Sequence, residues 1–313
     1  MKIIVENHIP FIQGKLEAAG HEVTYLPPEA FTPQAVRDAD TLIIRTRTRC
    51  GAALLDGSRV RTIVTATIGT DHIDSGYCLR RGIAVHNAPG CNAPAVAQYV
   101  LASLSALGVR SGTIGIVGVG HVGSIVDRWA RANGFRTLLC DPPLGLDTPL
   151  AALAAEADVI TFHTPLDATT RHVADDAFFE RCRRKPVIIN AARGPIVDTS
   201  ALVDALGAGR VGGAVIDCWE GEPAINRELL ELAAIATPHI AGYSLEGKRR
   251  ATAMALHAAD PSIPVELDPV AEAPTLESIV ASYSPVYDTT CLKNNPQDFE
   301  ALRNHYDYRP EPR

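Results

Sequence analysis

A short buried strand that leads straight into a glycine-rich turn constrains the fold of this chain more than any other feature. Thr113–Val117 has the composition of a buried strand, and the turn after it carries Gly118, Gly120 and Gly123 before an amphipathic helix. In such turns the first glycine permits the tight bend, the second lets the backbone approach a pyrophosphate, and the third lets helix and strand pack closely. Asp141 closes the next expected strand. This context predicts a dinucleotide-binding fold.

The residues around this turn favour NAD as the cofactor. The helix that begins within the turn, at His121 and Val122, would face the pyrophosphate with the partial positive charge of its amino terminus. Asp141 would accept hydrogen bonds from the adenosine ribose hydroxyls. Pro142 and Pro143 follow it, and no basic residue stands there to hold a 2′-phosphate. NAD is therefore predicted rather than NADP.

Strand patterns alternate with helical patterns along most of the chain, which predicts parallel sheets with both faces covered. Each of the strand candidates before residue 93 is bounded by Gly, Pro or Asp. These candidates are Lys2–Val5, Glu22–Leu26, Thr41–Thr46, Thr62–Thr67 and Ala84–Asn87. A helix over Ala93–Leu107 would connect them to six further strands. These are Thr113–Val117, Thr137–Asp141, Val159–Phe162, Val187–Ala191, Ala214–Asp217 and Ile235–Thr237.

The pattern predicts an α/β protein with two parallel-sheet lobes, of the Rossmann and flavodoxin kinds. The NAD-binding lobe, residues 93–242, would be inserted into a substrate-binding lobe made of 1–92 and 243–260. The remaining residues, 261–313, differ from both lobes. Residues 261–298 read poorly as helix or strand, and Phe299–Tyr306 could form one final helix. Apolar residues here need burial, which favours a small third element: Leu276, Ile279, Val280, Val286 and Tyr287.

Polar segments follow three of the later strands and predict a catalytic site. Arg193, the segment Asp217–Pro223 and His239 would lie at strand carboxyl ends, where ligands bind in open α/β sheets. An arginine fork can grip a carboxylate. A histidine titrates near neutral pH and can take or return a hydroxyl proton, and a neighbouring acid would hold its ring. Beside a nicotinamide, this combination suits hydride exchange with a hydroxy acid.

An arginine-rich segment suggests a place for an anion. If Arg45, Arg47 and Arg49 lie on a strand, they face one side and could line a cleft that binds a phosphate. A solvated basic strand end is an equally good interpretation.

These motifs resemble the D-isomer-specific 2-hydroxyacid dehydrogenases. The resemblance rests on Gly118–Gly123, Arg193–Gly194, Asp217–Pro223 and Pro238–His239, and extends to Thr67–His72, Ala88–Asn92, Cys140–Pro143, Thr161–Leu166 and His239–Lys248. Within the family it narrows to the branch that oxidises 4-phospho-D-erythronate to 2-oxo-3-hydroxy-4-phosphobutanoate in vitamin B6 biosynthesis. Tyr287–Asp288, Leu292–Lys293 and Phe299–Tyr306 resemble that branch's dimerisation domain, here shortened to residues 261–313.

The resemblance also implies roles for individual residues. Those implied to be catalytic are Arg193, Glu222 and His239. Those implied to contact the nucleotide, besides the glycine turn with His121 and Val122, are Asp141, Thr164, Asp217 and Gly242. Those implied to contact the substrate are Thr46, Thr67 and Tyr243, to which the phosphate argument adds Arg45 and Arg47. A homodimer is expected, with closure of the two lobes excluding water during hydride transfer.

Composition excludes several other classes. The formal net charge of −7 argues against a non-specific nucleic-acid binder. No apolar run approaches the ~18 residues of a membrane span, and the amino terminus lacks the basic head and apolar core of a signal peptide. The seven cysteines form no CxxC pair, so neither a metal site nor a disulfide scaffold is expected. A cytoplasmic protein with reduced thiols is predicted.

Two alternative functions stay open. A reductase or dehydrogenase for another phosphorylated or phosphonate 2-oxo or 2-hydroxy acid would use the same trio. A non-catalytic NAD-sensing protein on the same fold is more remote, because a sensor has no need to keep Arg193, Glu222 and His239 together.

Overall fold

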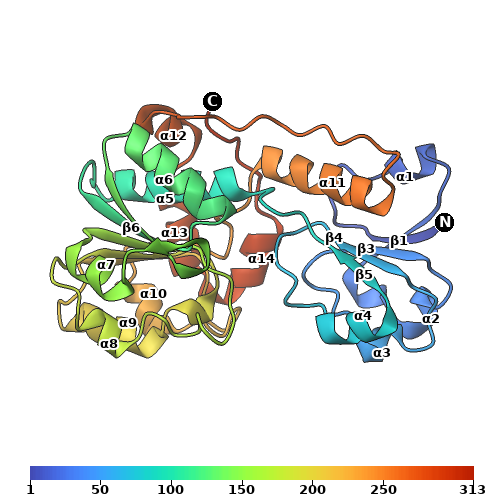
Figure 1. The fold of residues 1–313 in the computed structure, drawn as a ribbon, viewed down its shortest axis with the longest axis horizontal. Helices are drawn as coiled ribbons and strands as arrows, with labels where there is room; N and C mark the ends of the chain where they lie inside the picture. The colour runs from blue at the N-terminus through green and yellow to red at the C-terminus, as the bar shows by residue number, and fades with distance from the viewer. The chain divides into compact units, whose positions relative to one another are not determined.

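The computed structural model describes residues 1–313, except for the side chain at position 147. The chain forms two compact units (Figure 1): Met1–Asn92 with Leu245–Pro269, and Ala93–Ser244 with Val270–Arg313. It therefore passes from one unit to the other three times. Within the described part of the chain, no helix has the length and apolar character needed to cross a membrane.

The first unit is built on a five-stranded parallel sheet in the order β2-β1-β3-β4-β5. The strands are β1 (Lys2–Glu6), β2 (Glu22–Leu26), β3 (Thr41–Ile44), β4 (Thr62–Thr65) and β5 (Ala84–His86). Its helices are α1 (Lys15–Ala18), α2 (Pro33–Val36), α3 (Ala52–Leu55), α4 (Ser75–Arg81) and α11 (Leu245–Ala259), with a 3-10 turn, η1 (Pro28–Ala30).

Alternating apolar residues cover both faces of this sheet. Ile3 and Val5 point to one face, where Leu256 of α11 packs against them. Ile4 points to the other face and packs in a cluster with Leu54 of α3. Figure 1 shows α11 running along the first face. A segment that follows the whole second sheet in sequence thus completes the core of the first unit.

The end of β3 corrects one prediction. The strand stops at Ile44, and the chain turns at once, with the Thr48 amide donating to the Arg45 carbonyl oxygen. The buried carboxylate of Glu6 accepts the Arg45 amide at 2.9 Å, which draws the backbone out of the ladder. Arg45, Arg47 and Arg49 therefore do not alternate along a strand, and the prediction that they share one strand face is wrong.

The second unit is built on a seven-stranded sheet in the order β12-β11-β10-β9-β6-β7-β8. The strands are β6 (Thr113–Val117), β7 (Arg136–Asp141), β8 (Leu146–Asp147), β9 (Val159–Phe162), β10 (Val187–Asn190), β11 (Gly213–Ile216) and β12 (Ile235–Ala236). Its helices are α5 (Ala93–Ala106), α6 (His121–Ala132), α7 (Leu150–Glu156), α8 (Asp176–Phe179), α9 (Thr199–Gly207) and α10 (Arg227–Leu232), with η2 (Pro142–Leu144) and η3 (Gly194–Ile196).

The six predicted strands of this sheet are present and parallel. β8, which no pattern predicted, is two residues long and pairs antiparallel with β7. Neighbouring residues of the inner strands pack on opposite faces: Ile188 lies in one core cluster and Ile189 in the other. Full burial of both faces explains why these strands read as continuous apolar runs. The predicted fold class, two parallel-sheet α/β domains, is confirmed.

The segment after Pro269 belongs to the second unit and holds more helix than predicted. It forms α12 (Leu276–Ser282), α13 (Val286–Asn294), η4 (Pro296–Asp298) and α14 (Phe299–Asn304). In α12 the Thr275 side chain caps the first turn by accepting from the Ser278 amide, and Ile279 is fully buried. Such short helices depend on packing rather than on periodicity. Val280, Val286 and Tyr287, which were expected to need burial, are exposed.

Candidate active site

The glycine turn lies between β6 and α6 and leaves an open space at its middle glycine. Gly118 has a left-handed backbone (φ 88°), and an added Cβ there would lie 2.7 Å from the Thr164 nitrogen. An added Cβ on Gly123 would lie 2.0 Å from the Gly118 oxygen. At Gly120, which precedes the first residue of α6, it would meet nothing within 4 Å. The turn is thus close-packed on both sides and open where a pyrophosphate would approach.

Asp141 ends β7 and Thr164 follows β9, the two strands that flank β6. The Asp141 carboxylate accepts the Val119 amide at 2.7 Å, which ties the end of β7 to the turn. A carboxylate can accept several more hydrogen bonds. Thr164 follows β9, and its hydroxyl is buried with no hydrogen-bond partner among the described residues. An orphaned buried hydroxyl beside the turn fits a ligand that would complete it. These residues and the start of α6, His121 and Val122, suit a dinucleotide.

His239 and Glu222 form the central polar pair of the site. The His239 Nδ1 lies 2.6 Å from Glu222 Oε1, and the two side chains are 24% and 25% exposed. Burial alone would raise the pKa of Glu222, but the hydrogen bond with His239 and the charge of Arg303 lower it, and the net shift is downward. Glu222 therefore stays ionised and holds the imidazole with Nε2 available to a ligand.

Asp217 fixes the backbone that carries His239. This fully buried carboxylate accepts the Thr237 hydroxyl at 2.6 Å, the Ile240 amide at 2.7 Å and the Ala241 amide at 3.0 Å. Burial raises its pKa, although His239 and these hydrogen bonds oppose the shift. His239 itself has φ 57°, a left-handed conformation that non-glycine residues adopt only when their surroundings impose it. Gly242, implied to contact the nucleotide, lies at the end of this segment.

Arg193 follows β10, the strand next to β11, and a buried asparagine shapes its loop. Asn190 is 1% exposed, and its side-chain amide donates to the carbonyl oxygens of Arg193 and Gly194. Its Oδ1 accepts the Ala192 amide. Gly194 allows the loop to lie against Trp219, since an added Cβ would be 2.1 Å from the Trp219 carbonyl. Sequence reasoning missed Asn190, although a polar residue ending an apolar strand was a visible signal.

Tyr243 lies among side chains of the C-terminal segment. Its hydroxyl accepts from Arg303 Nε at 3.3 Å, and its ring meets those of Tyr306 and Tyr308 edge-on at 6.2 Å. The implied substrate contact of Tyr243 thus has neighbours in α14 and the residues after it.

The other implied substrate residues lie in the first unit. Arg45 donates from Nη1 to the His8 carbonyl at 3.1 Å. Thr46 and Arg47 are exposed in the turn after β3. Thr67 lies after β4, where its hydroxyl is 2.7 Å from that of Thr65. Arg45, Thr46 and Arg47 are thus together in one turn, and contact with a substrate stays a prediction for all four residues.

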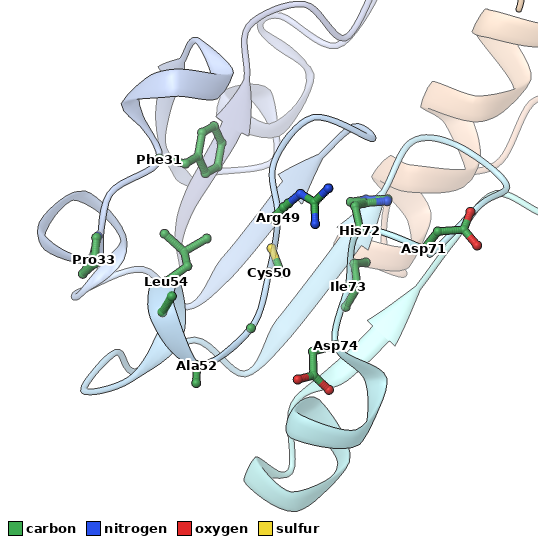
Figure 2. Close-up of a pocket in the computed structure, with 12 residues that line it drawn as sticks. Phe31, Pro33, Arg49, Cys50, Ala52, Leu54, Asp71, His72, Ile73 and Asp74 are labelled. Carbon is green, nitrogen blue, oxygen red and sulfur yellow. The ribbon is translucent and has the colours of Figure 1, made fainter. Parts of the chain in front are cut away.

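A pocket of about 520 Å³ opens on the first unit (Figure 2). Arg49 and His72 supply its basic side chains, and Phe31 and Leu54 are among its apolar ones. None of the four implied substrate residues of this unit is among the described residues that line it. The pocket is therefore separate from the predicted substrate residues. Within the pocket, burial lowers the pKa of His72, despite the opposing charge of Asp71.

The site supports proton transfer and anion binding with its own side chains. An ionised carboxylate holds an imidazole, and an arginine stands at the end of the neighbouring strand. Among the described side chains, no group of three or more His, Cys, Asp or Glu residues gathers as a metal site would.

Comparisons of the sequence with known proteins identify a family and several relatives. Residues 97–241 match the family described as "D-isomer specific 2-hydroxyacid dehydrogenase, NAD binding domain". Erythronate-4-phosphate dehydrogenase of Bacteroides thetaiotaomicron is 46% identical, with 99% of this chain and 97% of that protein aligned. Erythronate-4-phosphate dehydrogenase of Porphyromonas gingivalis is 40% identical, with 100% and 93% aligned.

Solved structures share the fold. The TT0316 protein of Thermus thermophilus aligns with a TM-score of 0.71 at 27% identity, covering 91% of this chain and 98% of that one. D-lactate dehydrogenase of Aquifex aeolicus, solved with NAD and lactic acid, aligns with a TM-score of 0.69 at 24% identity, covering 84% and 95%.

Proposed function

The chain belongs to the D-isomer-specific 2-hydroxyacid dehydrogenases and is an NAD-dependent dehydrogenase, and within this family we propose that it oxidises 4-phospho-D-erythronate at C2. The product is 2-oxo-3-hydroxy-4-phosphobutanoate, and the reaction belongs to vitamin B6 biosynthesis. Relatives with 40% and 46% identity over nearly the whole chain carry the name of this activity, which supports the choice of substrate.

NAD, when bound, supplies the chemistry by accepting the hydride from C2 of the substrate. We assign its binding to residues of the second unit. The amino terminus of α6 and the open position at Gly120 suit the pyrophosphate. Asp141 suits the adenosine ribose, and the orphaned hydroxyl of Thr164 suits a further contact.

His239 is the general base in this proposal. Because its Nδ1 faces the Glu222 carboxylate, Nε2 is the nitrogen that takes the C2 hydroxyl proton. Glu222 stabilises the imidazolium that results, as its lowered pKa keeps it ionised at neutral pH. Arg193 grips the substrate carboxylate with its guanidinium fork. Deprotonation of the hydroxyl assists departure of the hydride, because the electrons of the O–H bond form the carbonyl.

The observation that carries this proposal is the 2.6 Å contact between His239 and Glu222 at the edge of the sheet that bears the glycine turn. The test is an absorbance assay for NADH with 4-phosphoerythronate, and with a 2-oxo acid added as acceptor in case bound NADH does not leave. Wild-type protein should oxidise phosphoerythronate far faster than erythronate. His239→Ala should lower kcat by about 10²–10⁴-fold, the usual contribution of a general base.

His86→Ala is the matched control, because His86 is an exposed histidine of the first unit. It should keep wild-type turnover. Reduction of another phosphorylated or phosphonate 2-oxo acid, with no turnover of phosphoerythronate, would reject the proposed substrate. Absence of any turnover despite NAD binding would favour a sensor.

We also propose that the enzyme is a homodimer and works in the cytoplasm. Val286 and Tyr287, which are consecutive residues of α13, are 54% and 75% exposed, and exposed apolar side chains suit an interface. Five of the seven cysteines are buried as thiols, as in proteins of reducing compartments. Light scattering should give the mass of two chains for the wild type and of one chain for Val286→Asp. A monomeric wild type would reject the dimer.

A further inference from the structure

A buried arginine lies outside the predicted catalytic trio, in the residues that follow α14. Arg309 is 6% exposed, and it lies beside Ser244 in an isolated parallel bridge. Its guanidinium stacks 3.9 Å from the centre of the Tyr283 ring. Its Nε donates to the side-chain oxygen of Gln98, a buried residue of α5, at 3.0 Å. A charge placed so deep in a protein is costly unless its hydrogen bonds are satisfied.

Most of the remaining hydrogen bonds of Arg309 go to one short segment. Nη1 donates to the Ile240 carbonyl at 3.1 Å and to the Tyr243 carbonyl at 3.2 Å. Nη2 donates to the Ala241 carbonyl, and also to the Ala95 carbonyl of α5 at 3.2 Å. Three carbonyl oxygens of the segment that directly follows His239 are therefore held by one guanidinium.

Asp217 holds the same segment from its amide side. Its carboxylate accepts the Ile240 and Ala241 amides, while Arg309 binds the carbonyls of the same two residues. Ile240 and Ala241, the two residues after His239, thus each contact a buried anion through the amide and a buried cation through the carbonyl. His239 needs such support, because its left-handed backbone persists only where the surroundings determine it.

We propose that Arg309 is a positioning residue for the reaction, and that its grip on the carbonyls of Ile240, Ala241 and Tyr243 holds the His239 imidazole in line with Glu222. It touches neither substrate nor cofactor in this role. The proposal rests on the proposed function for its kinetic test, but the geometry of the His239–Glu222 pair can be measured without a substrate. The rigid fork of arginine matters, because a lysine cannot bind these carbonyls at once.

The experiment uses the full chain with Arg309→Ala, Arg309→Lys and, as the control, Arg313→Ala, which removes an exposed arginine of the same segment. A displaced imidazole should lower kcat on the order of 100-fold in Arg309→Ala. Arg309→Lys should remain well below wild type, and added guanidinium should restore part of the kcat of Arg309→Ala. Arg313→Ala should match wild type.

Proton NMR gives the second readout. The short Nδ1–H contact with Glu222 should give a far-downfield proton signal that His239→Ala removes. We expect this signal to be lost or shifted in both Arg309 variants and retained in Arg313→Ala. Should Arg309→Ala fail to fold, Arg309→Lys carries the test.

The outcomes separate this proposal from the proposed function. Wild-type protein that shows the downfield signal but does not oxidise phosphoerythronate rejects the substrate, and the signal in the variants still decides the role of Arg309. A kcat and a downfield signal that are both unchanged in Arg309→Lys would overturn the positioning role. Loss of kcat with an unchanged signal and no rescue by guanidinium would overturn it as well.

Discussion

β1 in the first unit and β6 in the second occupy equivalent places in their sheets. β1 lies between β2, the next strand in sequence, and β3, and β6 lies between β7, the next strand in sequence, and β9. At the end of β1, the buried Glu6 carboxylate accepts hydrogen bonds from the Arg45 amide and the Thr48 hydroxyl. An irregular segment then leads to the four-residue helix α1. Beyond β6, three glycines lead directly into the twelve-residue helix α6.

The two turns have the same topology and opposite chemistry. In the first unit a side chain of the protein fills the space at the strand end and satisfies the neighbouring backbone. In the second unit glycine leaves that space open, and a long helix directs its amino terminus at it. A parallel sheet thus provides a place for a ligand, and the residues of the turn decide whether a ligand can enter.

Breaking the second turn should have the largest effect. Gly123→Ala places a Cβ 2.0 Å from the Gly118 carbonyl oxygen, which is closer than van der Waals contact allows, so the turn must move. We expect a loss of about 3 kcal/mol of stability and no measurable NAD binding. Tryptophan fluorescence during urea unfolding reports on this unit alone, because Trp129 and Trp219 are the two tryptophans of the chain. A wild-type midpoint for this variant would contradict the role given to the turn.

Gly120→Ala should separate ligand binding from folding. The added methyl meets no protein atom, so stability should stay at the wild-type value, but it occupies the approach to the pyrophosphate. NAD affinity should fall about tenfold or more, a cost of at least about 1.4 kcal/mol. Titration calorimetry measures it, and Gly207→Ala in α9, which also meets no neighbour, is the control. Equal affinities for the two variants would show that the open space is not used.

Acid should act on the second unit through His163, which lies beside Gly118. Burial lowers its pKa to about 3, and its Nδ1 is buried although part of the residue is exposed. Between pH 6.5 and 3 the unfolded chain binds a proton there and the folded chain does not, so stability falls as pH falls. The slope should be about half of 1.4 kcal/mol per pH unit at pH 6.5 and should approach about 1.4 as the pH falls further.

His163→Gln should remove this slope, measured by tryptophan fluorescence between pH 7 and 5.5. His305→Gln, an exposed histidine of the same unit, should keep it. The first unit offers a contrast, because hydrogen bonds from Ser262 and His21 lower the pKa of Asp260 to about 2, and that carboxylate stays ionised throughout this range. An unchanged slope in His163→Gln would refute the assignment.

The smallest effect is expected in the first turn. Glu6→Gln keeps the shape of the side chain but replaces one charged acceptor by a donor, which should cost about 1 kcal/mol of stability. NAD affinity should not change. Far-UV circular dichroism during unfolding is the measurement, since the first unit lacks tryptophan, and the exposed Glu29→Gln is the control. A loss of NAD affinity in Glu6→Gln would remove the distinction between the turns.

Sequence patterns predicted the features that repeat locally. The glycine turn, the six strands of the second sheet and the strand-end positions of Arg193, Glu222 and His239 all follow from short-range patterns. The helices α12 and α13 were not predicted, because a helix with as few buried residues as α12, where Ile279 is buried, shows no apolar periodicity in its sequence. The predicted strand at β3 was too long, because Glu6, whose carboxylate binds the Arg45 amide and ends the strand, lies far away in sequence.

Asn190 and Arg309 show the same limit within the candidate site. Each acts on the site by binding backbone groups. The residue types of its partners therefore do not indicate the contact. Arg309 in addition lies more than sixty residues beyond the segment it holds. Such contacts become visible only when the chain is folded.

Because residues 93–244 of the second unit lie between the two segments of the first unit, the first unit cannot be completed during synthesis until those residues have been made. α11 covers the face of the first sheet that carries Ile3, Val5 and Ile43, but the ribosome makes it only after the whole of residues 93–244. At roughly 5–20 residues per second, those approximately 150 residues take about 8–30 s. Throughout that interval the nascent first sheet lacks its longest covering helix, while the second sheet can already assemble. During synthesis, the uncovered apolar face of the first sheet is therefore the surface of this chain that suits binding by a ribosome-associated chaperone.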